Sequence, residues 1–152
     1  MEARKPRHHS MPMTCKDKLE RVFSGEIRQT IRRGERYQVG DTLTIFEWTG
    51  TPYRSKWGRR IEETVVEVFP VIVGNCGLGL PHSEESEEPM GWLRIFTMVP
   101  WDADPWYARA LEELAMHDGL TPPTGVHLKE VLFAMYPECD FEKGEIFQVV
   151  RW

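Results

Sequence analysis

Residues 61–73 carry the longest strand signal in the chain, and they set the first limit on its fold. Their sequence, IEETVVEVFPVIV, is rich in β-branched and aromatic side chains, which favour an extended backbone. Pro70 lies inside this run and has no amide hydrogen for a sheet, so it predicts an edge strand, a bulge or a bend into a second strand. Further strands are predicted at residues 42–48, 92–97 and 146–151.

Helical patterns flank this strand-rich stretch. Residues 15–24 place apolar side chains at helical spacing, and residues 103–117 and 126–136 do the same, with Asp104 as the expected cap of the second helix. The order is therefore a helix, several strands, two helices and a final strand. This order predicts an α+β domain whose mostly antiparallel strands close into a small β-barrel with flanking helices.

A chain of 152 residues favours one domain, which we expect over residues 15–152. Residues 1–14 are basic and are expected to form a flexible tail. Residues 74–91 are Gly-rich and then acidic, and they predict an enlarged, exposed loop with few backbone hydrogen bonds. The acidic stretch at residues 84–88 either screens a binding cleft or only keeps the loop soluble.

Several protein classes are disfavoured by composition. No apolar run approaches the roughly 18 residues of a membrane helix, and no apolar segment follows the basic N-terminus as it would in a secretory signal. The three cysteines lie far apart without a CxxC pair, which predicts free thiols in a reducing cytoplasm and no zinc site. We therefore expect a cytoplasmic protein without membrane contact, metal or cofactor.

Charge is distributed unevenly along this acidic chain. Residues 1–60 hold 14 Lys and Arg against 7 Asp and Glu, whereas residues 61–152 hold 5 against 17. The net charge of −5 therefore conceals a basic N-terminal part. A local basic surface can bind a polyanion even on an acidic protein.

Four segments, in the same order, resemble the ASCH domain family (activating signal cointegrator homology). They are FSGEIRQTIR, VGDTLTIFEW, LAMHDGLTPP with the following LKEVLFAMYP, and EIFQVVRW. The resemblance covers roughly residues 16–152. It implies a PUA-like β-barrel and a ligand such as RNA or a modified base, bound in a cleft beside the barrel. It also allows an enzyme, since some small members are amidohydrolases acting on acetylated cytidine and others are ribonucleases.

Three positions correspond to the catalytic residues of the amidohydrolase branch. The resemblance places the family's threonine at Thr30, its lysine at Ile27 and its glutamate at His127. Isoleucine can neither assist a nucleophile nor hold a charge, whereas His127 could act as a base near neutral pH. Thr30 and His127 are thus the catalytic candidates, against the simpler alternatives of a strand residue and a helix-capping residue.

Two basic clusters suggest contacts to nucleic acid. Strand alternation in RQTIRR would place Arg28, Thr30 and Arg32 on one side and Gln29, Ile31 and Arg33 on the other. The segment WTGTPYRSKWGRR interleaves cations with aromatic rings, as single-stranded RNA binding requires. The predicted nucleic-acid-binding residues are Arg28, Thr30, Arg32, Arg33, Tyr53, Arg54, Lys56 and Trp57.

The sequence leaves three functions open. The first is an ASCH domain that binds RNA or a nucleotide in a basic cleft. The second is a hydrolase acting on a modified nucleoside or on RNA, and the third is a protein-interaction module. The missing lysine at Ile27 favours the first over the second.

Overall fold

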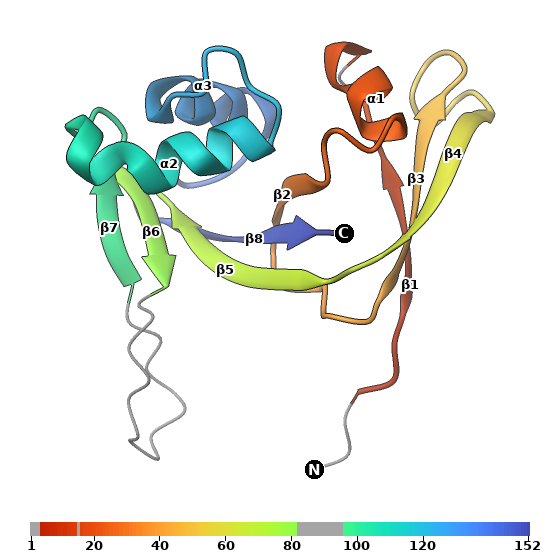
Figure 1. Ribbon diagram of the computed structural model, residues 1–152, viewed down its shortest axis with the longest axis horizontal. Coiled ribbons are helices and arrows are strands. Elements are labelled where there is room, and N and C mark those ends of the chain that lie inside the picture. The colour runs from red at the N-terminus through yellow and green to blue at the C-terminus, as the bar shows by residue number, and fades with distance from the viewer. Residues whose placement is uncertain (1–3, 15, 82–95) are drawn as a thin grey trace. The chain divides into compact units, whose positions relative to one another are not determined.

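The structure is a computed structural model that describes residues 4–14, 16–81 and 96–152 (Figure 1). The described part is α+β, as the sequence predicts, with mostly antiparallel strands. Its elements are β1 (His8–Pro12), α1 (Lys16–Phe23), β2 (Gln29–Arg33), β3 (Thr42–Trp48), β4 (Trp57–Thr64), β5 (Glu67–Val73), β6 (Gly77–Pro81), β7 (Phe96–Pro100), α2 (Pro105–His117), α3 (Gly125–Met135) and β8 (Glu145–Arg151).

The described strands form two sheets. The first has the order β1-β3-β4, in which β1 runs parallel to β3 and β4 runs antiparallel to it. The second has the order β2-β8-β5-β6-β7, with antiparallel pairing of β6 to both β5 and β7. The prediction that the four strand segments pair in one barrel-like sheet is therefore wrong, and the described strands contain no closed barrel.

Contacts divide the chain into two compact units. Unit 1 comprises the described parts of Met1–Thr30, Arg36–Val68 and Val150–Trp152, and unit 2 comprises those of Ile31–Glu35 and Phe69–Val149. Each unit has a hydrophobic core of its own. The core of unit 1 is built from Met11, Met13, Leu19, Val22, Ile27, Tyr37, Leu43, Ile45, Val65, Val150 and Trp152.

The core of unit 2 lies where strands meet the helices α2 and α3. Its buried side chains include Val71, Leu78, Leu111 and Phe147. α3 begins after Thr124, whose hydroxyl accepts a hydrogen bond from a backbone amide in the first turn and so caps the helix. The Thr124 cap and the apolar helix faces explain why the sequence pattern located both helices to within about two residues.

The long strand signal at residues 61–73 belongs to two strands. β4 ends at Thr64 and β5 begins at Glu67. The segment does divide into two strands, which is one of the outcomes predicted from Pro70. The break, however, comes before the proline, which lies within β5. Strand β3 occupies residues 42–48 as predicted.

Two segments expected to lack regular structure contain strands. The exposed loop predicted at residues 74–91 is wrong for its first part, because β6 lies there with Gly77, Leu78 and Gly79 buried. The backbone carbonyl of Val99 lies against Gly77, where any side chain would collide with it, so glycine allows close strand packing and does not mark a loop. Residues 82–91 of that loop, with the acidic stretch, and residues 92–95 lie outside the described residues.

The flexible tail predicted at residues 1–14 is wrong for β1. This strand pairs with β3 in register from His8 opposite Thr42 to Pro12 opposite Phe46, and Met11 is buried in the core of unit 1. A short strand that begins with two histidines and a serine gives little periodic signal, because the partner strand supplies the apolar surface that buries it.

The carboxylate of Asp41 binds the N-terminal segment that contains β1. This carboxylate is 1% exposed and accepts hydrogen bonds from Arg4, from His9 and from the backbone amides of Arg7 and Gln38. Burial raises the pKa of Asp41, but these hydrogen bonds outweigh burial and lower the pKa to about 2. The buried carboxylate is therefore kept charged, and it orders the segment that carries His8.

Two smaller expectations concern the thiols and the membrane. Cys76 and Cys139 are free thiols, and Cys15 lies outside the described residues. In the described ranges, no helix is long and apolar enough to span a membrane.

Candidate nucleic-acid interface

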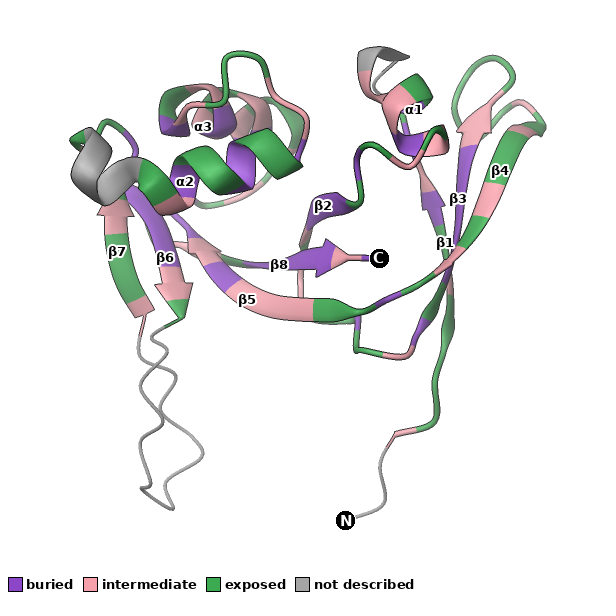
Figure 2. Cartoon of the chain, in the orientation of Figure 1, coloured by how far each residue is buried: buried purple, intermediate pink, exposed green. Residues whose placement is uncertain are grey.

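One side of the β1-β3-β4 sheet is turned away from the core of unit 1, and we call it the outer face. On β3, Leu43 and Ile45 enter the core, so Thr44 and Phe46 belong to the opposite side. The strand register places further residues beside them. The outer face is made by His8, Ser10, Thr42, Thr44, Phe46, Arg60, Glu62 and Thr64. Figure 2 shows β4 alternating between exposed and half-buried positions.

A β-bulge brings Trp57 onto this face. Phe46 pairs with Arg60, but Trp48 pairs with Trp57, so two residues of β4, Gly58 and Arg59, oppose the single residue between Phe46 and Trp48. Trp57 and Arg60 are three positions apart and would face opposite sides in a regular strand. The extra residue turns Trp57 to the side of Phe46 and Arg60.

Four aromatic rings gather at this end of the outer face. Trp57 stacks on Phe46 with 3.9 Å between ring centroids and an interplanar angle of 18°. Trp48 meets Phe46 edge-on at 5.1 Å and Tyr53 at 5.2 Å. Phe46 is buried beneath its neighbours, whereas Trp57 is 38% exposed and Tyr53 is 82% exposed. Trp57 and Tyr53 therefore expose aromatic surface to a ligand, and the rings packed against them support that surface.

The connection between β3 and β4 holds Tyr53 in place. Its ends are joined by hydrogen bonds from the Thr49 amide and hydroxyl to the Lys56 carbonyl, and Ser55 bridges Gly50 and Thr51. Tyr53 has φ 63°, a left-handed conformation that costs energy for a bulky residue. The loop's own hydrogen bonds support this conformation, which leaves the ring exposed beside Trp48.

Three exposed cations belong to the same hairpin as Tyr53 and Trp57. Arg54, Lys56 and Arg60 have no carboxylate partner among the described residues, and the Arg60 guanidinium carbon lies 5.7 Å from the Trp57 ring centroid. Arg59 is different, because Glu20 and Glu47 bind it from two sides and the hydrogen bonds to them raise its pKa. Only the first three cations are available for phosphate.

The other end of the outer face is polar. Thr44 Oγ1 donates a hydrogen bond to Glu62 Oε1 at 2.7 Å. His8 Nε2 lies 2.8 Å from the same hydroxyl, and His8 Nδ1 lies 2.9 Å from Thr42 Oγ1. A hydroxyl has a single proton, which Thr44 gives to Glu62, so His8 must donate through Nε2. The cluster therefore orients the exposed Glu62 carboxylate.

The predicted side of β2 does not form. Gln29, Thr30 and Ile31 are all buried, so the strand does not alternate between a core side and a ligand side. The alternation failed because the sheet is covered on both faces at this point. Thr30 and the exposed Arg28 belong to unit 1, and Arg28 donates to the carbonyl of Gly25.

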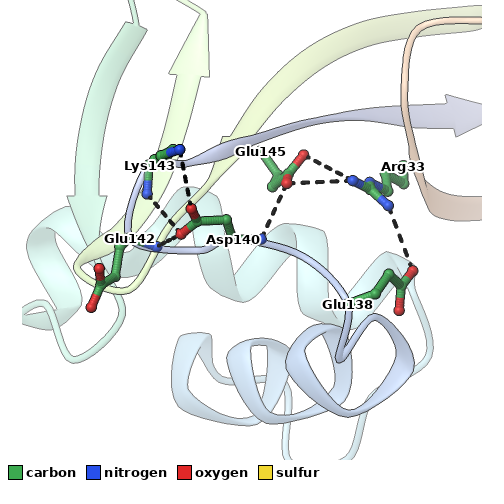
Figure 3. A network of polar contacts seen from close by, with 6 residues as sticks. All are labelled: Arg33, Glu138, Asp140, Glu142, Lys143 and Glu145. Atoms are coloured by element: carbon green, nitrogen blue, oxygen red, sulfur yellow. Dashed lines mark hydrogen bonds and ion pairs between the residues drawn. The ribbon is translucent and has the colours of Figure 1, made fainter.

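Arg32 and Arg33 belong to unit 2, where Arg33 forms ion pairs with glutamates (Figure 3). Its guanidinium lies 3.4 Å from Glu145 and 3.7 Å from Glu138. Asp140 continues the network, since its amide donates to Glu145 and its carboxylate accepts the amides of Glu142 and Lys143. Arg33 thus belongs to an ion-pair network at the turn before β8.

The resemblance places the amidohydrolase lysine and glutamate at two positions whose side chains make structural contacts. Ile27 is 2% exposed in the core of unit 1. His127 lies in the first turn of α3, where its amide donates to Thr124 and its ring Nδ1 lies 2.9 Å from the Pro122 carbonyl. A carbonyl only accepts, so Nδ1 carries the proton, and the ring supports the helix start. In the parts of the chain that the structure describes, no group of His, Cys, Asp or Glu is arranged to hold a metal ion.

The structure adds outer-face residues that the sequence reasoning missed, namely His8, Thr44, Phe46 and Glu62. The signal was present in TLTIF, where Thr42, Thr44 and Phe46 alternate with core residues. Comparison of the chain with protein-family models, with curated proteins and with solved structures found no match.

Proposed function

We propose that unit 1 binds single-stranded RNA on the aromatic end of its outer face. The observation that carries this proposal is the exposure of Tyr53 and Trp57 among Arg54, Lys56 and Arg60, three cations without a carboxylate partner in the described chain. A protein that binds unpaired nucleotides needs flat rings for the bases and cations for the phosphates. Both occur here within one hairpin.

Base stacking on these rings would supply part of the binding free energy. Each base that stacks on an aromatic ring contributes about 1–3 kcal/mol. Trp57 is already seated on Phe46, so little side-chain freedom is lost when a base stacks. The indole Nε1 of Trp48 is buried without a hydrogen-bond partner among the described residues, although the ring itself packs beside Tyr53.

The resemblance to ASCH domains supports the same class of ligand, because it implies RNA or a modified base. Membership of that family, with its PUA-like barrel, is part of the proposal. The place of binding differs from the expectation, however. Of the eight residues predicted to bind, Tyr53, Arg54, Lys56 and Trp57 share one hairpin, whereas Arg33 is held by acids in unit 2.

Fluorescence anisotropy with a short labelled RNA over a salt series tests the proposal. If each free cation contacts a phosphate, log Kd should change with log salt by about 0.7 per contact. Replacing Arg54, Lys56 or Arg60 by Ala should each reduce that slope by about one contact. Trp57→Ala should weaken binding about 5-fold to 100-fold without changing the slope, because stacking releases no counterion.

Arg109→Ala is the matched control, since this exposed arginine on α2 in unit 2 pairs with Glu113. Its salt slope should equal that of the wild-type protein. Absence of binding at low salt, or wild-type affinity in Trp57→Ala, would contradict the proposal.

A further inference from the structure

Resting on the proposed function, we propose that the outer face reads a guanine base of the bound RNA through the carboxylate of Glu62. Aromatic stacking alone accepts every base, because every base has a flat face. The polar end of the outer face adds a hydrogen-bonding group beside the rings. The proposal therefore concerns which base the site prefers.

The position of Glu62 is set by its neighbours on the sheet. It pairs with Thr44 across β3 and β4, and the Thr44 hydroxyl holds its Oε1 at 2.7 Å. Its carboxylate has no cationic partner among the described residues. Glu62 Oε2 and the remaining lone pair of Oε1 are thus available to a ligand.

The spacing between the rings and the carboxylate suits one base. Thr44 and Phe46 are successive outer-face residues of β3, so their side chains emerge about 7 Å apart. Trp57 covers Phe46, and Thr44 fixes Glu62. A base stacked on Trp57 can point its edge along the strands, with a hydrogen bond of about 2.9 Å to the carboxylate.

A carboxylate selects among bases by the donors that they present. Guanine offers two adjacent donors, N1–H and the N2 amino group, which match the two carboxylate oxygens. Uracil offers one N–H between two carbonyls. Adenine and cytosine each offer an amino group beside a ring acceptor, which a carboxylate repels. Guanine is therefore the standard base that suits Glu62 best.

Glu62 also lowers affinity for strands that lack this base. A carboxylate near phosphate-binding cations repels phosphate, so it disfavours binding unless base donors compensate. Thr44 and His8 act as positioning residues, because they hold the carboxylate and do not themselves meet the base in this arrangement.

The test compares four labelled pentanucleotides, UUGUU, UUIUU, UUAUU and UUCUU, by anisotropy at one salt concentration. A single purine avoids association between strands. Inosine lacks only the N2 amino group, so wild-type protein should bind UUIUU about 5-fold to 10-fold more weakly than UUGUU. The adenine and cytosine strands should bind about 10-fold to 100-fold more weakly.

Glu62→Gln should reduce the inosine-to-guanine ratio of Kd to about one. Glu63→Gln is the matched control, because it removes the same charge from the next residue of β4, opposite the core residue Leu43, and should keep the wild-type ratio. Thr44→Val, which loses the hydroxyl, should give an intermediate ratio. Circular dichroism spectra establish that each variant is folded.

The outcomes separate this inference from the function beneath it. If the strands bind but wild-type protein shows an inosine-to-guanine ratio near one, or Glu62→Gln keeps the wild-type ratio, guanine reading by Glu62 is overturned and RNA binding stands. If no strand binds at low salt, the proposed function is overturned, and this inference with it.

Discussion

The two units use charge in opposite ways. By sequence, the segments of unit 1 contain 13 Lys and Arg against 9 Asp and Glu, a balance of +4, whereas those of unit 2 contain 6 against 15, a balance of −9. In unit 2, Arg33 is surrounded by Glu138 and Glu145. In unit 1, Arg54 and Lys56 have no such partner within the described chain.

This contrast shows that a cluster of cations in a sequence is only a first indication of a binding site. Arg33 and Arg54 are equivalent by composition, but carboxylates distant in sequence neutralise one and not the other. Arg59 makes the same point inside unit 1, where Glu20 from α1 and Glu47 from β3 bind it. The carboxylates that fold back onto a cation decide whether it is available.

The largest expected effect concerns one glycine in each unit, Gly77 and Gly58, at which a Cβ atom would lie too close to its neighbours. A Cβ on Gly77 in β6 would collide with the carbonyl oxygen of Val99 and approach its carbonyl carbon to 2.8 Å. Backbone cannot move away cheaply, so Gly77→Ala should destabilise the protein by about 3 kcal/mol in urea unfolding. Hydrogen exchange should increase first in β6 and β7.

Gly58→Ala in unit 1 is the matched comparison. Its Cβ would approach Glu47 Cγ at 2.9 Å, but that atom belongs to a flexible side chain. The loss should be about 1 kcal/mol or less. If Gly58→Ala were the more damaging of the two, the backbone contact would not be what limits Gly77.

The next effect tests Asp41, the buried carboxylate of unit 1. In unit 2, by contrast, the ion pairs of Arg33 are exposed. Asp41→Asn removes the charge that Arg4 and His9 bind, and it should lower the free energy of unfolding by about 2 kcal/mol. Faster amide exchange in β1 should accompany this loss. Glu26→Gln, which removes an exposed partner of Arg21, should change stability by less than about 0.5 kcal/mol.

The same carboxylate predicts a pH dependence of stability. The pKa of Asp41 is lowered from 3.8 in the unfolded chain to about 2 in the folded protein, so its charged form is stabilised by folding. This contribution, about 2 kcal/mol, is complete above pH 5 and is lost as the pH falls from about 4 to 2. The stability difference between wild type and Asp41→Asn should therefore shrink over that range. A difference that stays constant down to pH 2 would contradict it.

The smallest effect separates the arginines of the two units. Arg33→Ala should change stability by less than about 1 kcal/mol, because its ion pairs are exposed, and it should leave the salt slope of RNA binding unchanged. Arg60→Ala should reduce that slope by about 0.7. Equal slopes in both variants would remove the distinction between free and occupied arginines.

Much of the fold follows from local patterns. The strand β3 and the helices α2 and α3 were predictable because each has its own periodicity or cap. β1 was not, because its burial depends on a partner strand and on the distant Asp41. β6 was not, because its glycines serve close packing of strands, and a sequence shows only their flexibility.

The candidate site was predictable in part for the same reason. Tyr53, Arg54, Lys56 and Trp57 are close in sequence, so composition identified them together. Glu62 was missed because its relation to Trp57 depends on the bulge and on the register with β3. Thr30 was misplaced because alternation alone does not reveal that both faces of a strand are covered.

The bulge in β4 has a consequence for insertions and deletions. Because one additional residue of β4 turns Trp57 onto the outer face, inserting one residue beside Glu47 in β3 would give Gly58 and Arg59 a partner each and would turn the indole to the opposite side of the sheet. Every side chain of β4 would keep its identity, but the stack on Phe46 would be lost. Among related chains, the length of β3 relative to β4 should therefore discriminate those that have the aromatic platform from those that lack it, even where the tryptophan itself is retained.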